Sequence, residues 1–128
     1  MTPRIFRVIV PVSDIERAAT FYAQLLGVPG ARVSDNRHYF ECGGVVLACV
    51  DPRGTRGDFR PNPDHVYFAV SNLETVYARA RSAGGNWLED AIATRDWGER
   101  SFYLRDPFDN PLCVVDDTTL FTGGRFVP

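Results

Sequence analysis

The segment Val12-Ser-Asp-Ile-Glu recurs 58 positions later as Val70-Ser-Asn-Leu-Glu. Each copy follows a run rich in β-branched residues and precedes apolar residues at helical spacing. A repeat of this kind constrains the fold strongly, because each copy represents one supersecondary unit. Each half is also too small to bury a sheet alone, so we expect the two copies to be joined in one domain.

Both copies carry the sequence of a helix start. Ser13 with Glu16, and Ser71 with Glu74, are typical of capping boxes, in which the Ser hydroxyl and the Glu carboxylate bond free backbone N–H groups. The apolar spacing after each box predicts a helix. The predicted helices end at glycines, which are Gly27 in the first copy and Gly84-Gly85 in the second.

Short runs of β-forming residues surround each predicted helix. Gly43-Gly44 predicts a tight hairpin turn in the first half, and Asp106–Pro111 predicts a turn in the second. We therefore predict an α+β fold of two tandem βαβββ modules. The predicted strands are 4–12, 32–34, 38–42 and 45–50 in the first module, and 65–70, 86–88, 100–105 and 112–115 in the second.

A chain of 128 residues fits one domain, so we expect a single domain over residues 1–128. A segment dense in Pro, Gly, Arg and Asp separates the two copies and is interpreted as a linker within that domain. The predicted parts are module one at 4–50, the linker at 51–63, module two at 64–116 and a tail at 117–128. Leu120 and Phe121 in the tail are expected to pack either on a neighbouring copy or back on their own module.

The number and spacing of charged residues indicate which classes of binding partner to expect. Lys and Arg total 14 and Asp and Glu total 16, scattered along the chain, so we expect neither nucleic acid nor a membrane as a partner. The longest apolar runs, such as Val45–Val50, are far shorter than the roughly 20 residues of a membrane span, and the N-terminus lacks the pattern of a signal peptide. Three cysteines without a C-x-x-C pair indicate reduced thiols, so a cytoplasmic location is expected.

Three stretches point to a known family. They are Val10-Pro-Val-Ser-Asp-Ile-Glu-Arg-Ala-Ala-Thr-Phe-Tyr with the following Leu25-Leu-Gly, His65-Val-Tyr-Phe-Ala-Val-Ser-Asn-Leu, and Trp97-Gly-Glu-Arg-Ser-Phe-Tyr-Leu-Arg-Asp-Pro-Phe-Asp-Asn-Pro. With these residues the chain resembles the vicinal oxygen chelate superfamily, which includes glyoxalase I, extradiol dioxygenases and the fosfomycin- and bleomycin-resistance proteins. The resemblance covers about residues 6–115. It implies the glyoxalase/bleomycin-resistance/dioxygenase fold, in which the modules form half-barrels around a cleft, and it implies a homodimer.

Metal-dependent members of that superfamily place one ligand on the first strand and one on the last strand of each module. The resemblance puts these four positions at Arg7, Ala48, His65 and Cys113, of which only His65 is of the usual type. Arg7 would repel a metal cation. The remaining candidates, His65 and Cys113, are at most two neutral ligands and would not balance the positive charge of a divalent ion, so no cofactor is expected. The alternative is a non-standard divalent-metal site made by His65, Cys113 and a third group.

Strand alternation extends the predicted cleft wall, since it places Tyr67, Tyr103 and Cys113 on the same side as His65. By resemblance, Trp97 overhangs the mouth of the cleft, where it would stack on a planar ligand. The predicted ligand-binding residues are Arg7, His65, Tyr67, Trp97, Tyr103 and Cys113. The alternatives are ordinary sheet aromatics at Tyr67 and Tyr103, a rim or dimer contact at Trp97, and at Cys113 either an inert buried thiol or a nucleophile beside His65.

Arg7 requires an anionic partner, because a guanidinium on the cleft face of a strand is costly without one. That partner is either an internal carboxylate, such as Glu41 or Asp116, or a carboxylate or phosphate of a ligand. The preferred hypothesis is therefore a protein that binds a small, anionic or planar molecule without the standard metal site. The alternatives are a lyase, isomerase or dioxygenase with a non-standard metal site at His65, and a partner-binding domain with a collapsed cleft. No catalytic residue is assigned.

Overall fold

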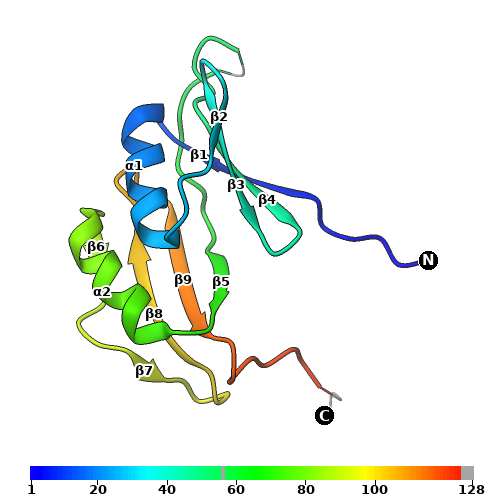
Figure 1. The fold of residues 1–128 in the computed structure, drawn as a ribbon, viewed down its shortest axis with the longest axis vertical. Coiled ribbons are helices and arrows are strands. Elements are labelled where there is room, and N and C mark those ends of the chain that lie inside the picture. The colour runs from blue at the N-terminus through cyan, green and yellow to red at the C-terminus, as the bar shows by residue number, and fades with distance from the viewer. Residues whose placement is uncertain (56, 125–128) are drawn as a thin grey trace.

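The computed structural model describes residues 1–55 and 57–124 (Figure 1). The first module contains β1 (Arg7–Pro11), α1 (Ile15–Leu26), β2 (Ala31–Ser34), β3 (Arg37–Cys42) and β4 (Val45–Val50). The second contains β5 (Val66–Val70), α2 (Leu73–Ala83), β6 (Trp87–Leu88), β7 (Ala93–Thr94), β8 (Arg100–Arg105) and β9 (Pro111–Asp116). No helix within these residues is long and apolar enough to cross a membrane. Residue 56 of the predicted linker and residues 125–128 of the predicted tail lie outside the described residues.

Each module forms its own sheet. The strand order is β1-β4-β3-β2 in the first, called sheet A, and β5-β9-β8-β6 in the second, called sheet B, with β7 also paired to β8. In both sheets the first strand of the module lies parallel to the last, and the other pairs are antiparallel. This shared arrangement confirms the predicted α+β fold of two βαβββ modules.

The predicted strands differ from the observed ones mainly at sheet edges. β4 and β8 have the predicted bounds, whereas β1 covers residues 7–11 rather than 4–12. β1 is shorter because its one partner strand, β4, begins only at Val45, which lies beside Phe6 and leaves residues 4 and 5 without a strand beside them. β7 was not predicted, since two residues are too short to show a periodic pattern.

The helices begin one residue later than predicted. Their N-caps are Asp14 and Asn72, whose side-chain oxygens accept hydrogen bonds from the backbone N–H groups of Arg17 and Thr75. The serine before each cap was the predicted cap, and this prediction is wrong. Aspartate and asparagine are caps at least as good as serine, so the capping role falls to the residue that stands directly before the first helical turn.

The helices end where the sequence predicted. Gly27 and Gly84 follow the last helical residues with φ of 75° and 82°, a left-handed conformation that glycine adopts without strain. Positive φ values at Gly43 and Gly44 also fit the predicted tight turn between β3 and β4.

The two helices pack against each other and cover one side of the sheets (Figure 1). α1 lies on β3 and β4, and α2 lies on β9, with the apolar core between helices and sheets. Because side chains alternate along a strand, each sheet keeps a second face that points away from the helices, here called its open face. The open face of sheet A carries Arg7, Ile9, Pro11, Arg37, Tyr39, Glu41, Val46, Ala48 and Val50, and that of sheet B carries Tyr67, Ala69, Ser101, Tyr103, Arg105, Cys113 and Val115.

Candidate functional site

Four of the six predicted ligand-binding residues lie together on the open face of sheet B. Tyr67 and Tyr103 flank Cys113 in one row across β5, β9 and β8. His65, directly before β5, places its ring centroid 5.1 Å from that of Tyr103 and 6.0 Å from that of Tyr67. The result is an aromatic surface above a buried thiol.

The thiol of Cys113 is 1% exposed beneath these rings. Burial raises its pKa to about 11, although the Ser101 hydroxyl and Arg95 act in the opposite direction. Cys113 is therefore a neutral thiol at pH 7, whereas a nucleophilic cysteine needs a lowered pKa. The geometry favours the inert alternative for this residue.

Arg95 and Glu89, which the sequence analysis did not include, form the edge of this surface. The Arg95 guanidinium donates to both carboxylate oxygens of Glu89, at 2.6 and 3.1 Å, and to the Ser101 hydroxyl at 2.9 Å. It also lies over the Tyr103 ring, 4.6 Å from the centroid. Arg95 thus fixes the Tyr103 ring, and its charge is already paired. The sequence offered one signal for this ion pair, namely two residues of opposite charge that stand six positions apart.

A hollow of about 460 Å³ continues the open face of sheet B toward the chain end. Tyr67, Trp97 and Phe121 are 58%, 49% and 56% exposed and line it, and the small side chains of Ala69 and Val115 lie between them. The three rings come from β5, from the loop after β7 and from the tail. Such a hollow contradicts the hypothesis of a collapsed cleft without an open pocket.

Glu99 holds two of these aromatic residues. Its carboxylate accepts a 2.7 Å hydrogen bond from Trp97 Nε1 and a 2.9 Å hydrogen bond from the backbone N–H of Phe121. These two bonds lower the pKa of Glu99, the Phe121 bond most. Glu99 is therefore ionised at neutral pH and fixes both the loop and the tail at the rim of the hollow.

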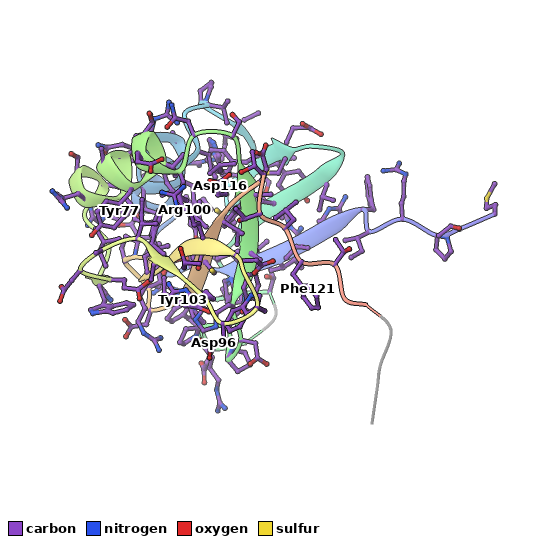
Figure 2. All side chains as sticks on the ribbon, turned by 90° about the horizontal axis from the view of Figure 1, so that it is seen from below. Tyr77, Asp96, Arg100, Tyr103, Asp116 and Phe121 are labelled. Atoms are coloured by element: carbon purple, nitrogen blue, oxygen red, sulfur yellow. The ribbon has the colours of Figure 1, made fainter. Side chains whose placement is uncertain are left out.

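The tail contacts its own module, but Leu120 and Phe121 are still 47% and 56% exposed, so their packing on a neighbouring copy stays a prediction. The Thr119 hydroxyl accepts from the backbone N–H of Arg100, and both apolar residues line the hollow. In Figure 2 the tail leaves β9 beside Asp116 and reaches Phe121 on the β5 side of the sheet. The sequence signal for Phe121 was the apolar pair Leu120-Phe121 in a stretch, residues 117–125, that has no other apolar side chain.

Arg7 lies apart from the other five predicted residues, on the open face of sheet A. Its guanidinium carbon is 4.9 Å from the Phe6 ring centroid and 5.3 Å from that of Tyr39. Across residues 1–55 and 57–124, no ion pair involves Arg7. The two carboxylates considered for it are engaged elsewhere, because Glu41 accepts from Gly44 N and Asp116 pairs with Arg100.

The four metal-ligand positions of the family do not form a donor set here. The strand registers pair Ile9 with Ala48 and Tyr67 with Cys113, so Ala48 and Cys113 occupy equivalent places in the two sheets. Neither Arg7 nor Ala48 can donate to a cation, and among the described residues no three His, Cys, Asp or Glu side chains gather as a metal site. Of the four positions only His65 and Cys113 carry donor atoms, so the family's standard four-residue ligand set is not present.

A second, apolar groove of about 580 Å³ lies where the two modules meet. It runs between β1 and β4 on one side and β5 on the other, with Leu26 at the end of α1 in its wall. β1 and β5 are the edge strands of their sheets. Two exposed apolar residues, Ile5 and Val28, line this groove.

Comparisons with known proteins agree on one family. Residues 4–114 match the model of the glyoxalase/bleomycin resistance protein/dioxygenase superfamily. The chain is 30% identical over 112 residues to metallothiol transferase FosB of Shouchella clausii (strain KSM-K16), which covers 85% of this chain and 76% of that protein. A glyoxalase/bleomycin resistance protein from Albidiferax ferrireducens T118 is 25% identical with a TM-score of 0.74, covering 86% of this chain and 95% of that one. A glyoxalase-related enzyme from Fulvimarina pelagi has a TM-score of 0.78 at 18% identity, covering 95% and 94%.

Proposed function

Since this chain belongs to the glyoxalase/bleomycin resistance protein/dioxygenase superfamily, we propose that it binds a small planar molecule in the hollow on sheet B, without the standard metal of that family. The observation that carries this proposal is the convergence of three exposed aromatic rings on one hollow. Tyr67, Trp97 and Phe121 come from three different segments, and Glu99 holds two of them in place. Exposed rings around small side chains favour a flat ligand, because stacking adds to the gain from burying apolar surface.

The neighbouring surface of sheet B would orient the ligand. His65 and Tyr103 present polar atoms beside the Tyr67 ring, and pockets for small molecules combine apolar walls with a few such groups. Burial, followed by Cys113 and Tyr67, raises the pKa of Tyr103. Its hydroxyl therefore keeps its hydrogen at neutral pH and can donate it to a ligand.

Fluorescence of Trp97 tests this proposal. Trp87→Phe leaves Trp97 as the one tryptophan of the chain, since the sequence has two. In this background, naphthalene-2-carboxylate is expected to quench the emission saturably, and its saturated analogue, decahydronaphthalene-2-carboxylate, is expected to bind much more weakly. Phe121→Ala should weaken the flat ligand by about three- to tenfold, the size of one aromatic contact. Val33→Ala, which removes an exposed apolar residue from β2, is the control. Equal binding of flat and saturated probes would contradict the proposal.

The alternative function is an enzyme of lyase, isomerase or dioxygenase type with a non-standard metal site at His65. The similarity to the metallothiol transferase of Shouchella clausii favours this alternative. Elemental mass spectrometry of the untagged protein decides between them. Stoichiometric metal that disappears in His65→Ala would support the enzyme, whereas less than about a tenth of an equivalent after soaking with Zn, Mn, Ni and Fe(II) would support the metal-free binding protein.

We also propose that the protein is a homodimer joined along the apolar groove between the modules. The edges of β1 and β5 are unpaired there, and an unpaired strand edge is a template for a second chain. Ile5 and Val28, which line it, are 69% and 43% exposed. Sedimentation equilibrium should show a dimer that Ile5→Asp dissociates, while a monomeric wild-type protein would refute this assignment.

A further inference from the structure

We propose that Arg7, Arg37 and Tyr39 on the open face of sheet A form a binding site for an oxyanion, the carboxylate or phosphate group of a small ligand. Position 7 lies on β1 and positions 37 and 39 lie on β3, with β4 between the two strands. His38 and Phe40 alternate with them and are buried on the helix side, so the three side chains share the open face.

Tyr39 connects the two arginines. Its hydroxyl oxygen accepts a 2.9 Å hydrogen bond from Arg37 Nη1, and the Arg7 guanidinium lies over its ring at 5.3 Å from the centroid. Since the oxygen accepts from Arg37, the hydroxyl hydrogen remains for another acceptor. Phe6 supports Arg7 from a second side, at 4.9 Å. Such contacts hold the Arg7 guanidinium in place before a ligand arrives, which reduces the entropy lost on binding.

Neither Arg7 nor Arg37 forms an ion pair within the part of the chain that the structure describes. The ion pairs in residues 1–55 and 57–124 use other arginines, namely Arg32, Arg53, Arg95 and Arg100. Glu41 is the acidic residue on the same face and lies in one row with Arg7 across Val46. Its carboxylate accepts a 2.6 Å hydrogen bond from the backbone N–H of Gly44 and forms no ion pair with Arg7 among the described residues, so two arginines face one acidic residue here. Arg37 is half-buried, and a half-buried cation without a counter-ion favours an anion from solution.

The chemistry of the group selects an oxyanion. A guanidinium presents parallel N–H donors that match the two oxygens of a carboxylate or phosphate, and the Tyr39 hydroxyl adds one donor. The hollow on sheet B contrasts with this site, because the ionised Glu99 lies at its rim. The two sheets thus offer different chemistry, aromatic stacking on sheet B and anion recognition on sheet A.

This inference goes beyond the proposed function. It can be tested with anions that have no flat part, which cannot stack on the aromatic rings of sheet B. The measurement is an NMR titration of ¹⁵N-labelled protein at constant ionic strength, following the Arg Nε–Hε signals, once with inorganic phosphate and once with acetate. The signals of Arg7 and Arg37 are expected to shift saturably, with a Kd of the order of 1 mM that corresponds to a few hydrogen bonds. Tighter binding of phosphate assigns a phosphate group, and equal or tighter binding of acetate assigns a carboxylate.

Matched variants separate the site from general attraction between charges. Arg7→Gln and Arg37→Gln should each weaken binding by at least about fivefold, and Tyr39→Phe, which keeps the ring but removes the donor, by about two- to threefold. Arg81→Gln is the control, because Arg81 stacks on Tyr77 at 5.1 Å in the same way but lies on α2. The amide spectrum of each variant reports folding. Linear shifts of all arginine signals, or equal affinity in Arg7→Gln and Arg81→Gln, would overturn the proposal.

Discussion

The Tyr22 hydroxyl on α1 donates a 2.6 Å hydrogen bond to Asp106 Oδ2 in the turn between β8 and β9, and so joins the two modules. Asp106 is fully buried and also accepts from the backbone N–H groups of Phe108 and Asn110. The Asn110 side chain donates both to Asp106 and to the carbonyl of Pro11 on β1. Burial raises the pKa of Asp106, and the hydrogen bonds from Tyr22 and Asn110 oppose that rise. One buried carboxylate is thus the polar centre of the contact between modules.

Tyr22→Phe should lower the free energy of unfolding by about 1–3 kcal/mol, because a buried carboxylate then loses one of its donors. Urea denaturation followed by circular dichroism measures the change. Tyr77→Phe is the control, since the Tyr77 hydroxyl bonds only a half-buried carbonyl, that of Glu89, within the second module. A loss no larger than that of the control would show that the Tyr22 bond adds no stability.

The ion pair of Glu89 with Arg95 should make stability depend on pH. The hydrogen bonds from Arg95 hold the pKa of Glu89 below its usual range, so its contribution is present above about pH 4.5 and is lost as pH falls through the lowered value. Glu89→Gln should therefore cost about 1–2 kcal/mol at pH 7 and progressively less in acid.

Urea denaturation of the wild type and of Glu89→Gln between pH 3 and pH 7 measures this difference. Glu16→Gln is the matched control, because Glu16 pairs with Arg32 while its side chain is 80% exposed, and it should change little at any pH. A Glu89→Gln deficit that stays constant over this range would contradict the titration of Glu89.

Cys113 should react slowly with iodoacetamide at neutral pH. Its pKa of about 11 leaves very little thiolate at pH 7.5, so the alkylation rate should rise about tenfold per pH unit from pH 8 to pH 10. Peptide mass spectrometry after timed labelling gives the rate at this residue, with Cys113→Ser to identify its peptide. Rapid labelling of Cys113 at pH 7 would restore the hypothesis of a nucleophilic thiol beside His65.

Gly30→Ala should lower the free energy of unfolding by more than the strain of an alanine in a left-handed backbone conformation. Gly30 has φ of 62°, and an added Cβ would lie 2.7 Å from the carbonyl oxygen of Tyr39 and 2.7 Å from Phe40 Cε1. Strain and overpacking together should cost about 2–4 kcal/mol. Gly43→Ala is a matched control, because Gly43 has the same φ of 62° and nothing within 4 Å of an added Cβ. Equal losses in urea denaturation would show that Gly30 matters only through its backbone.

The fold was accessible from the sequence because local patterns and the repeat agreed. β4 and β8 were predicted to the residue, since their alternation and their turns mark both ends. The errors lie where the bounds of a strand depend on its partner strand. The length of β1, for example, depends on where β4 begins. The helix caps were misplaced by one residue because adjacent Ser and Asp, or Ser and Asn, both carry capping oxygens.

The candidate site could be predicted from the sequence only in part, for a different reason. The alternation of side chains along a strand correctly grouped Tyr67, Tyr103 and Cys113 on one face, because the pairing register keeps side chains of the same face next to one another. It could not place Phe121, which reaches the hollow through an irregular tail held by Glu99. Nor could it separate Arg7 from the others, because the spacing of the repeat says nothing about the distance between two sheets.

The hydrogen bond from the Phe121 backbone to Glu99 makes the chain end a replaceable part of the pocket. Leu120 and Phe121 form one wall but belong to neither the sheet ladders nor the core. Exchange of this short segment alone would give the pocket a new shape while the scaffold folds unchanged, which offers a simple route to altered ligand preference.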